Sequence, residues 1–170
     1  DNKKSTITLS VGITDFSSRG VTPDLNLKPE IADYGDTVYS AVHRDINDTE
    51  SKSYGYKSGS SMAAPNYAGS AAAVKQSIRE DYGTLSAEAM QRLVQQKLCS
   101  AATPIDTDKI PLSPRSQGAG LADVAAAAKT PAVLYRDTDY KTKAELGDTL
   151  GSTTTFKFNV KNLTADALYY

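Results

Sequence analysis

The sequence has little of several residue types that carry particular functions, with no tryptophan, one cysteine and one histidine among its 170 residues. The single cysteine, Cys99, excludes an internal disulfide framework and is expected to be a half-buried apolar residue in a helix. The 19 basic and 20 acidic residues give a net charge of −1, without the positive excess that attracts nucleic acids or anionic membranes. No apolar run approaches the roughly 20 residues of a membrane span.

These absences lead us to expect no nucleic-acid partner, no membrane span in this chain, and neither a cofactor nor a metal. The single histidine, His43, adjoins a polar stretch over residues 44–50 that is typical of a surface loop. We therefore expect an exposed His43 that has no catalytic role.

The segment Ser58-Gly59-Ser60-Ser61-Met62-Ala63-Ala64-Pro65 leads into a run of alanine, glycine and serine. Gly59 permits a tight turn, and Pro65 is expected in the first turn of a helix, where its missing N–H is tolerated. A hydroxyl at a helix N-terminus lies beside unpaired N–H groups that favour negative charge. A serine nucleophile needs this setting, because an oxyanion forms beside it during acyl transfer. In the alternative, Ser60 or Ser61 is only a helix cap that accepts an N–H of the first turn.

Several blocks of the sequence resemble the subtilisin-like serine proteases, or subtilases. The nucleophile block of that family reads G-T-S-M-A-x-P, and residues 59–65 match it with Ser60 in place of threonine. Upstream, residues 16–20 read F-S-S-R-G and residues 28–31 read K-P-E-I, as in the family and in the same order. Residues 117–121, Q-G-A-G-L, resemble in particular the Gram-positive cell-envelope proteinases of the lactocepin and complement-cleaving streptococcal type.

The resemblance implies an α/β fold in two parts. Residues 1–130 would form the C-terminal part of a subtilisin-like peptidase domain, a three-layer fold with a parallel sheet. Residues 131–170 would form the first strands of a fibronectin type III-like β-sandwich. Such a sandwich needs about seven strands, which these residues are too few to supply, so the domain is expected to be truncated. The pattern itself predicts helices over residues 61–79, 86–100 and 121–129, and strands over residues 5–13, 37–42, 132–135 and 153–161.

The resemblance also assigns the catalytic roles. Ser61, directly before methionine in the motif, would be the nucleophile of a Ser-His-Asp triad. In subtilases the aspartate and the histidine precede the serine in the chain, and neither the D-T/S-G nor the H-G-T motif occurs here. The oxyanion-hole asparagine is also upstream in the family. We therefore expect this chain to need the upstream half of the catalytic domain, in cis or as a partner chain, and to be inactive alone.

Four residues depart from the family pattern. Asp33 and Tyr34 replace the usual A-P, Asn66 replaces a non-catalytic histidine, and Tyr67 replaces a valine. These changes fit either ordinary divergence or a loss of selection for catalysis. Two functions therefore stay open. The first is a secreted or cell-surface bacterial serine endopeptidase that cleaves extracellular polypeptides. The second is a non-catalytic surface or interaction protein that retains part of a subtilase scaffold.

Overall fold

The computed structural model describes residues 11–43, 47, 53–107, 110–145 and 151–168. Most of the strand predicted over residues 5–13 lies outside this part, and residues 11–13 have no regular structure. The elements in chain order are β1 (Gly20–Val21), β2 (Leu27–Lys28), β3 (Val38–Ala41), β4 (Tyr54–Lys57), α1 (Ser60–Tyr82), α2 (Ala87–Ser100), β5 (Asp106–Thr107), β6 (Ile110–Pro111), α3 (Pro114–Gln117), α4 (Val124–Lys129), β7 (Ala132–Arg136) and β8 (Phe158–Asn162).

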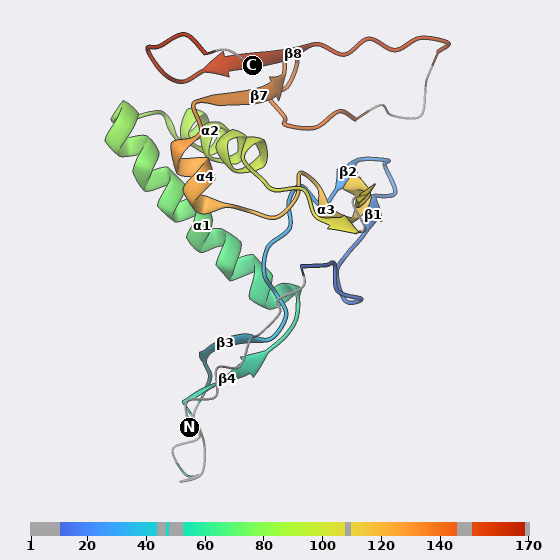
Figure 1. The fold of residues 1–170 in the computed structure, drawn as a ribbon, viewed down its shortest axis with the longest axis vertical. Coiled ribbons are helices and arrows are strands. Elements are labelled where there is room, and N and C mark those ends of the chain that lie inside the picture. The colour runs from blue at the N-terminus through green and yellow to red at the C-terminus, as the bar shows by residue number, and fades with distance from the viewer. Residues whose placement is uncertain (1–10, 44–46, 48–52, 108–109, 146–150, 169–170) are drawn as a thin grey trace, which may run out of the picture.

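Three helices and one strand enclose the core. α2 and α4 pack against the C-terminal half of α1, and β7 lies across α2 (Figure 1). The apolar face predicted for α2 is confirmed, and Cys99 beside it is buried more fully than expected, at 8% exposure. The buried core residues are Val74 and Ile78 of α1, Met90, Leu93 and Leu98 of α2, Ala127 of α4 and Val133 of β7.

The helix boundaries follow from local chemistry. α1 ends at Gly83, whose φ of 71° suits glycine and whose N–H donates to the carbonyl of Arg79. The Ser86 hydroxyl accepts the Ala89 N–H and caps α2, as predicted. α4 starts three residues later than predicted, at Val124, because Leu121 and Ala122 instead make backbone hydrogen bonds to Thr103 and Ala32.

The predicted parallel sheet is not formed by the described residues. Their named strands pair antiparallel in two-stranded sheets, in the orders β1-β2, β3-β4, β5-β6 and β7-β8. Parallel pairing occurs among them only as an isolated bridge between Ala32 and Leu121. Short connections join β1 to β2 and β5 to β6, and such connections suit hairpins, whereas parallel strands need a long crossover. The longer connection between β3 and β4 also joins an antiparallel pair. The described part after Pro131 contributes one antiparallel pair, β7-β8, and no second sheet to face it.

The segment from Gln117 to Ala122 makes hydrogen bonds to two distant parts of the chain, residues 105–112 and residues 30–32. Buried Gln117 accepts the Ile105 N–H at 2.6 Å and donates to the Leu112 carbonyl at 2.5 Å. On the other side, the Ala119 N–H donates to the Glu30 carbonyl at 2.9 Å, and the Ala32 N–H donates to the Gly120 carbonyl at 2.8 Å. Residues 30–32 are thereby held against the segment just before α4.

Gly118 allows this contact because it has no side chain. Its φ is 63°, and a Cβ at this position would lie 2.3 Å from the carbonyl carbon and oxygen of Glu30. Both the backbone conformation and the space therefore require glycine.

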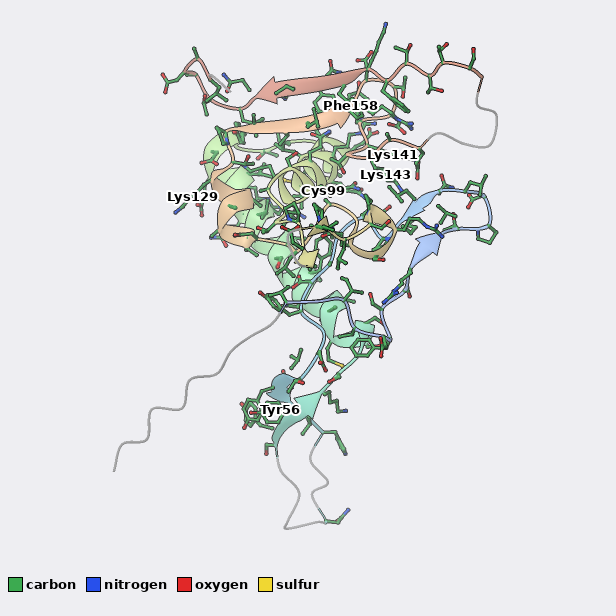
Figure 2. All side chains as sticks on the ribbon, turned by 45° about the vertical axis from the view of Figure 1, so that its right-hand side comes forward. Tyr56, Cys99, Lys129, Lys141, Lys143 and Phe158 are labelled. Atoms are coloured by element: carbon green, nitrogen blue, oxygen red, sulfur yellow. The ribbon has the colours of Figure 1, made fainter. Side chains whose placement is uncertain are left out.

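An ion-paired cluster ties the segment after β7 to β2. The Lys143 ammonium pairs with the Glu145 carboxylate at 2.6 Å and with the Glu30 carboxylate at 3.1 Å. It also donates a hydrogen bond to the Leu27 carbonyl at 2.6 Å. Glu145 in turn accepts the Leu27 N–H at 3.0 Å and pairs with Lys141 at 2.9 Å. Lys141 and Lys143 are labelled in Figure 2.

Burial alone would raise the pKa of the Glu145 carboxyl, but the hydrogen bonds and charges of Lys143 and Lys141 outweigh it and lower the pKa to about 2. Glu145 therefore contributes to stability as a carboxylate.

We predict that Gly118→Ala lowers the free energy of unfolding by about 2 kcal/mol or more, because the new Cβ meets the Glu30 backbone and strains φ. Gly69→Ala is the matched control, since nothing lies within 4 Å of a Cβ there and alanine favours a helix by about 0.5–1 kcal/mol. Urea denaturation followed by circular dichroism measures both changes. Equal midpoints for the two variants would contradict the close approach at Gly118.

We predict that Glu145→Gln lowers the free energy of unfolding by about 2 kcal/mol at pH 7. The folded pKa lies below the ordinary value of 4.5, so this stability is present above pH 4.5 and is lost as the pH falls towards 2. The difference between the variant and the parent should shrink over that range in denaturation curves. Glu88→Gln removes an exposed ion pair with Arg92 and should change stability by about 0.5 kcal/mol or less. A pH-independent effect at Glu145 would contradict the assignment.

Candidate active site

Ser61, the predicted nucleophile, is the second residue of α1 and its side chain is exposed. The turn before it passes through Gly59, whose φ of 149° favours glycine. Gly59 occupies the N-cap position, and no side chain of the described residues caps the helix, which disfavours the alternative that Ser60 or Ser61 is only a cap. The reason is that α1 begins at Ser60, which places both serines inside the first turn.

The N-terminus of α1 has the polarity that an oxyanion requires. The Met62 N–H is bonded to the Gly59 carbonyl at 2.9 Å. The Ser61 N–H has no acceptor in the described part of the chain, and the first turn contains no acidic residue. A free N–H at the positive end of a helix dipole stabilises negative charge that forms beside it. The arrangement suits an oxyanion next to the Ser61 hydroxyl.

Pro65 lies deeper in the helix than predicted. Because α1 starts at Ser60, Pro65 is in its second turn, inside the helix. Proline has no N–H, so the carbonyl of Ser61 lacks the donor that residue i+4 normally supplies. The backbone at Ser61 is therefore held less firmly by the helix itself than an interior residue would be.

The two serines face different cavities. Ser61 lines a hollow of about 160 Å³ between α1 and the β3–β4 hairpin, together with Met62 and Val38. Ser60 lines a separate groove of about 1170 Å³ that follows the flank of α1 and is also lined by Asp33 and Tyr67.

The two faces of the β3–β4 hairpin differ. Val38 and Ser40 line the hollow beside Ser61. Tyr39 and Tyr56 form a cross-strand pair with ring centroids 4.8 Å apart, and they are 61% and 69% exposed. Figure 2 shows Tyr56 at the margin of the hairpin, which extends away from the helical core. The hairpin thus closes one side of the hollow with small residues and presents its aromatic residues outward.

No described residue is placed as a base for Ser61. His43 is exposed, as predicted, and follows β3 on the far side from α1. At about 3.3 Å per residue, five residues of extended chain put it roughly 17 Å from Val38. Lys57 lines the hollow but makes no hydrogen bond to Ser61 among the described residues. A general base acts within hydrogen-bond reach of the hydroxyl, and no described side chain makes a hydrogen bond to Ser61.

A loop over residues 33–37 holds the turn before Ser61. The Gly59 N–H donates to the Gly35 carbonyl at 2.8 Å. The Ser58 hydroxyl donates to the Asp36 carboxylate at 2.5 Å and accepts the Thr37 N–H at 2.8 Å. A Cβ at Gly35 would lie 2.8 Å from the Gly59 carbonyl oxygen, which shows how closely the two segments approach.

Two of the departures from the family pattern contact each other. The Asn66 amide donates to the Asp33 carboxylate at 2.6 Å, and the Tyr34 N–H donates to the same oxygen at 2.7 Å. The second Asp33 oxygen is buried without a partner. Burial raises the pKa of Asp33, while the hydrogen bonds from Tyr34 and Asn66 oppose that change. Sequence reasoning flagged both positions but missed the pair; their joint departure from the family was the available signal.

In the part of the chain that the structure describes, no group of three or more histidine, cysteine, aspartate or glutamate side chains is arranged to bind a metal. None of its helices combines the length and apolar character required to cross a membrane.

A serine in a glycine turn at a helix N-terminus, followed by small residues, is the arrangement expected of a serine hydrolase of the subtilisin class. The family model described as "Subtilase family" matches residues 5–120. The chain therefore belongs to the subtilase family, and the predicted resemblance is confirmed. By family it is of the serine-protease type.

Several bacterial proteinases are similar to the chain. A PII-type proteinase of Lacticaseibacillus paracasei is 32% identical over 93% of this chain and 9% of its own length. A PI-type proteinase of Lactococcus lactis subsp. cremoris is 31% identical over the same shares. A C5a peptidase of Streptococcus pyogenes serotype M3 is 32% identical over 81% of this chain and 12% of its own length. The chain thus spans about a tenth of the length of these relatives.

Proposed function

We propose that Ser61 is the nucleophile of a subtilisin-like serine endopeptidase that cleaves extracellular polypeptides. One observation supports this role above the others: Ser61 is exposed at the start of α1, its hydroxyl does not cap the helix, and its N–H has no acceptor among the described residues. A serine with only a structural role at this position would use its hydroxyl to accept a backbone N–H and cap the helix.

In the proposed reaction, Ser61 Oγ forms a bond to the scissile carbonyl carbon while its proton moves to a histidine. The carbonyl electron pair shifts to oxygen, and the Ser61 N–H donates to the oxyanion. The C–N bond then breaks, and the histidine returns the proton to the leaving amine. The histidine, the aspartate that orients it and the oxyanion asparagine are proposed to come from the upstream half of the catalytic domain, in cis or as a partner chain.

The large groove beside α1 supports that assignment. Its walls combine small and apolar side chains such as Ala64, Ala71 and Met90 with charged ones such as Lys75 and Arg79. An apolar surface with a polar rim is typical of a contact surface. We propose that the upstream half of the domain covers it. By resemblance to the Gram-positive cell-envelope proteinases, we propose a secreted or cell-surface location, with residues 131–170 beginning a fibronectin type III-like domain.

The alternative of a non-catalytic scaffold has less support than the sequence alone suggested. It relied on the departures at Asp33, Tyr34 and Asn66. Asp33 and Asn66 form a hydrogen bond with each other, and the Gly59 N–H donates to the Gly35 carbonyl, so these departures are compatible with an ordered turn before Ser61.

We predict that the purified 170-residue chain has no measurable peptidase activity. In subtilisin, loss of the base alone lowers turnover by roughly 10⁶, and loss of one oxyanion donor lowers it by about 10²–10³. The measurement is hydrolysis of casein by the chain, with Ser61→Ala as the control. Casein hydrolysis that disappears in Ser61→Ala would refute the prediction.

In the complete protein that carries this sequence, we predict that a fluorophosphonate probe labels Ser61. Ser60 faces the other cavity and should stay unlabelled. Peptide mapping by mass spectrometry identifies the site, and Ser60→Ala is the matched control. Labelling that persists in Ser61→Ala but not in Ser60→Ala would reverse the assignment. Absence of any labelling would favour the non-catalytic scaffold.

A further inference from the structure

Ser61 lies between two contacts that join α1 to the loop over residues 33–37. On its N-terminal side, the Gly59 N–H is bonded to the Gly35 carbonyl at 2.8 Å. On its C-terminal side, the Asn66 amide is bonded to the Asp33 carboxylate at 2.6 Å. The same short loop therefore contacts the helix both before and after the nucleophile.

The helix at this point depends on such contacts. Pro65 supplies no N–H to the Ser61 carbonyl, and no side chain caps the N-terminus of α1. The usual internal hydrogen bonds that fix a first helical turn are thus reduced where the nucleophile lies. Contacts from outside the helix must set its orientation instead.

The Asp33 carboxylate is suited to a fixed contact. One of its oxygens is buried without a partner, and the other accepts from the Tyr34 N–H and the Asn66 amide. If the Asn66 amide were removed, the half-buried Asp33 carboxylate would keep only the Tyr34 N–H as a donor. One hydrogen bond does not offset the free-energy cost of removing a carboxylate from water. The Asn66 amide therefore adds a contact on the C-terminal side of Ser61 to those that Gly59 and Ser58 make on its N-terminal side.

We propose that Asp33 and Asn66 form a positioning pair that sets the orientation of Ser61 for attack. The inference rests on the proposed function of Ser61. Neither side chain touches the substrate in this account; both act through the loop over residues 33–37 and the turn at Gly59. A shift of about 1 Å at a nucleophile costs up to about 100-fold in rate, so the pair should affect turnover rather than substrate binding.

The test compares two substitutions in the complete protein, with fluorescein-labelled casein as substrate. Asn66→Leu keeps the size of the side chain and removes the donor, and it should lower kcat about tenfold or more with KM within about twofold. Asn66→His retains an N–H donor and should keep kcat within about threefold of the parent. Rescue by histidine but not by leucine separates the hydrogen bond from packing.

Gln76→Leu is the matched control. Gln76 lies on the same helix and donates its amide to the Glu80 carboxylate at 3.0 Å, remote from Ser61, so its replacement should leave kcat unchanged. If Asn66→Leu does not fold, Asp33→Ala combined with Asn66→Leu removes the buried carboxylate as well, and the same loss of kcat is expected.

Three results would overturn the inference: a kcat for Asn66→Leu equal to that of Gln76→Leu, a rise in KM at constant kcat, or equal losses in Asn66→Leu and Asn66→His. Ser61→Ala distinguishes a failure of this inference from a failure of the proposed function. If Ser61→Ala abolishes hydrolysis while Asn66→Leu does not lower kcat, only the positioning role is wrong. If Ser61→Ala retains activity, the proposed nucleophile is wrong.

Discussion

The close backbone contact between Gly118 and Glu30 is the constraint on which the rest of the structure depends. A Cβ at Gly118 would lie 2.3 Å from the Glu30 carbonyl, so only glycine lets the two segments form their hydrogen bonds. The contact fixes residues 30–32, and the loop over residues 33–37 follows directly and binds the turn at Gly59. The position of Ser61 thus depends on a glycine nearly sixty residues away in the sequence.

The nucleophile turn combines features that would weaken an ordinary helix start. α1 has no side-chain cap and no acidic residue in its first turn, and Pro65 removes one internal hydrogen bond. Among the described residues, the Ser61 N–H has no acceptor and the Ser61 hydroxyl does not cap the helix, as the proposed role of a nucleophile requires. The loop compensates through backbone and side-chain hydrogen bonds at Gly59, Ser58 and Asn66, so the stability of the turn is supplied from outside the helix.

The sequence predicted the features that depend on neighbouring residues. The extent of α1, the Ser86 cap of α2 and the exposure of His43 followed from local pattern and composition. It did not predict features that depend on distant contacts, such as the Asp33–Asn66 hydrogen bond or the late start of α4. The parallel sheet was expected from family resemblance alone, and the named strands of the described residues pair antiparallel instead.

A structure of the complete protein after reaction with a fluorophosphonate tests the central claim most directly. The account predicts a covalent bond from phosphorus to Ser61 Oγ, with the phosphonyl oxygen about 2.7–3.1 Å from the Ser61 N–H and the Asp33–Asn66 hydrogen bond intact. An adduct on Ser60, or an adduct on Ser61 whose oxygen points away from the N-terminus of α1, would contradict it.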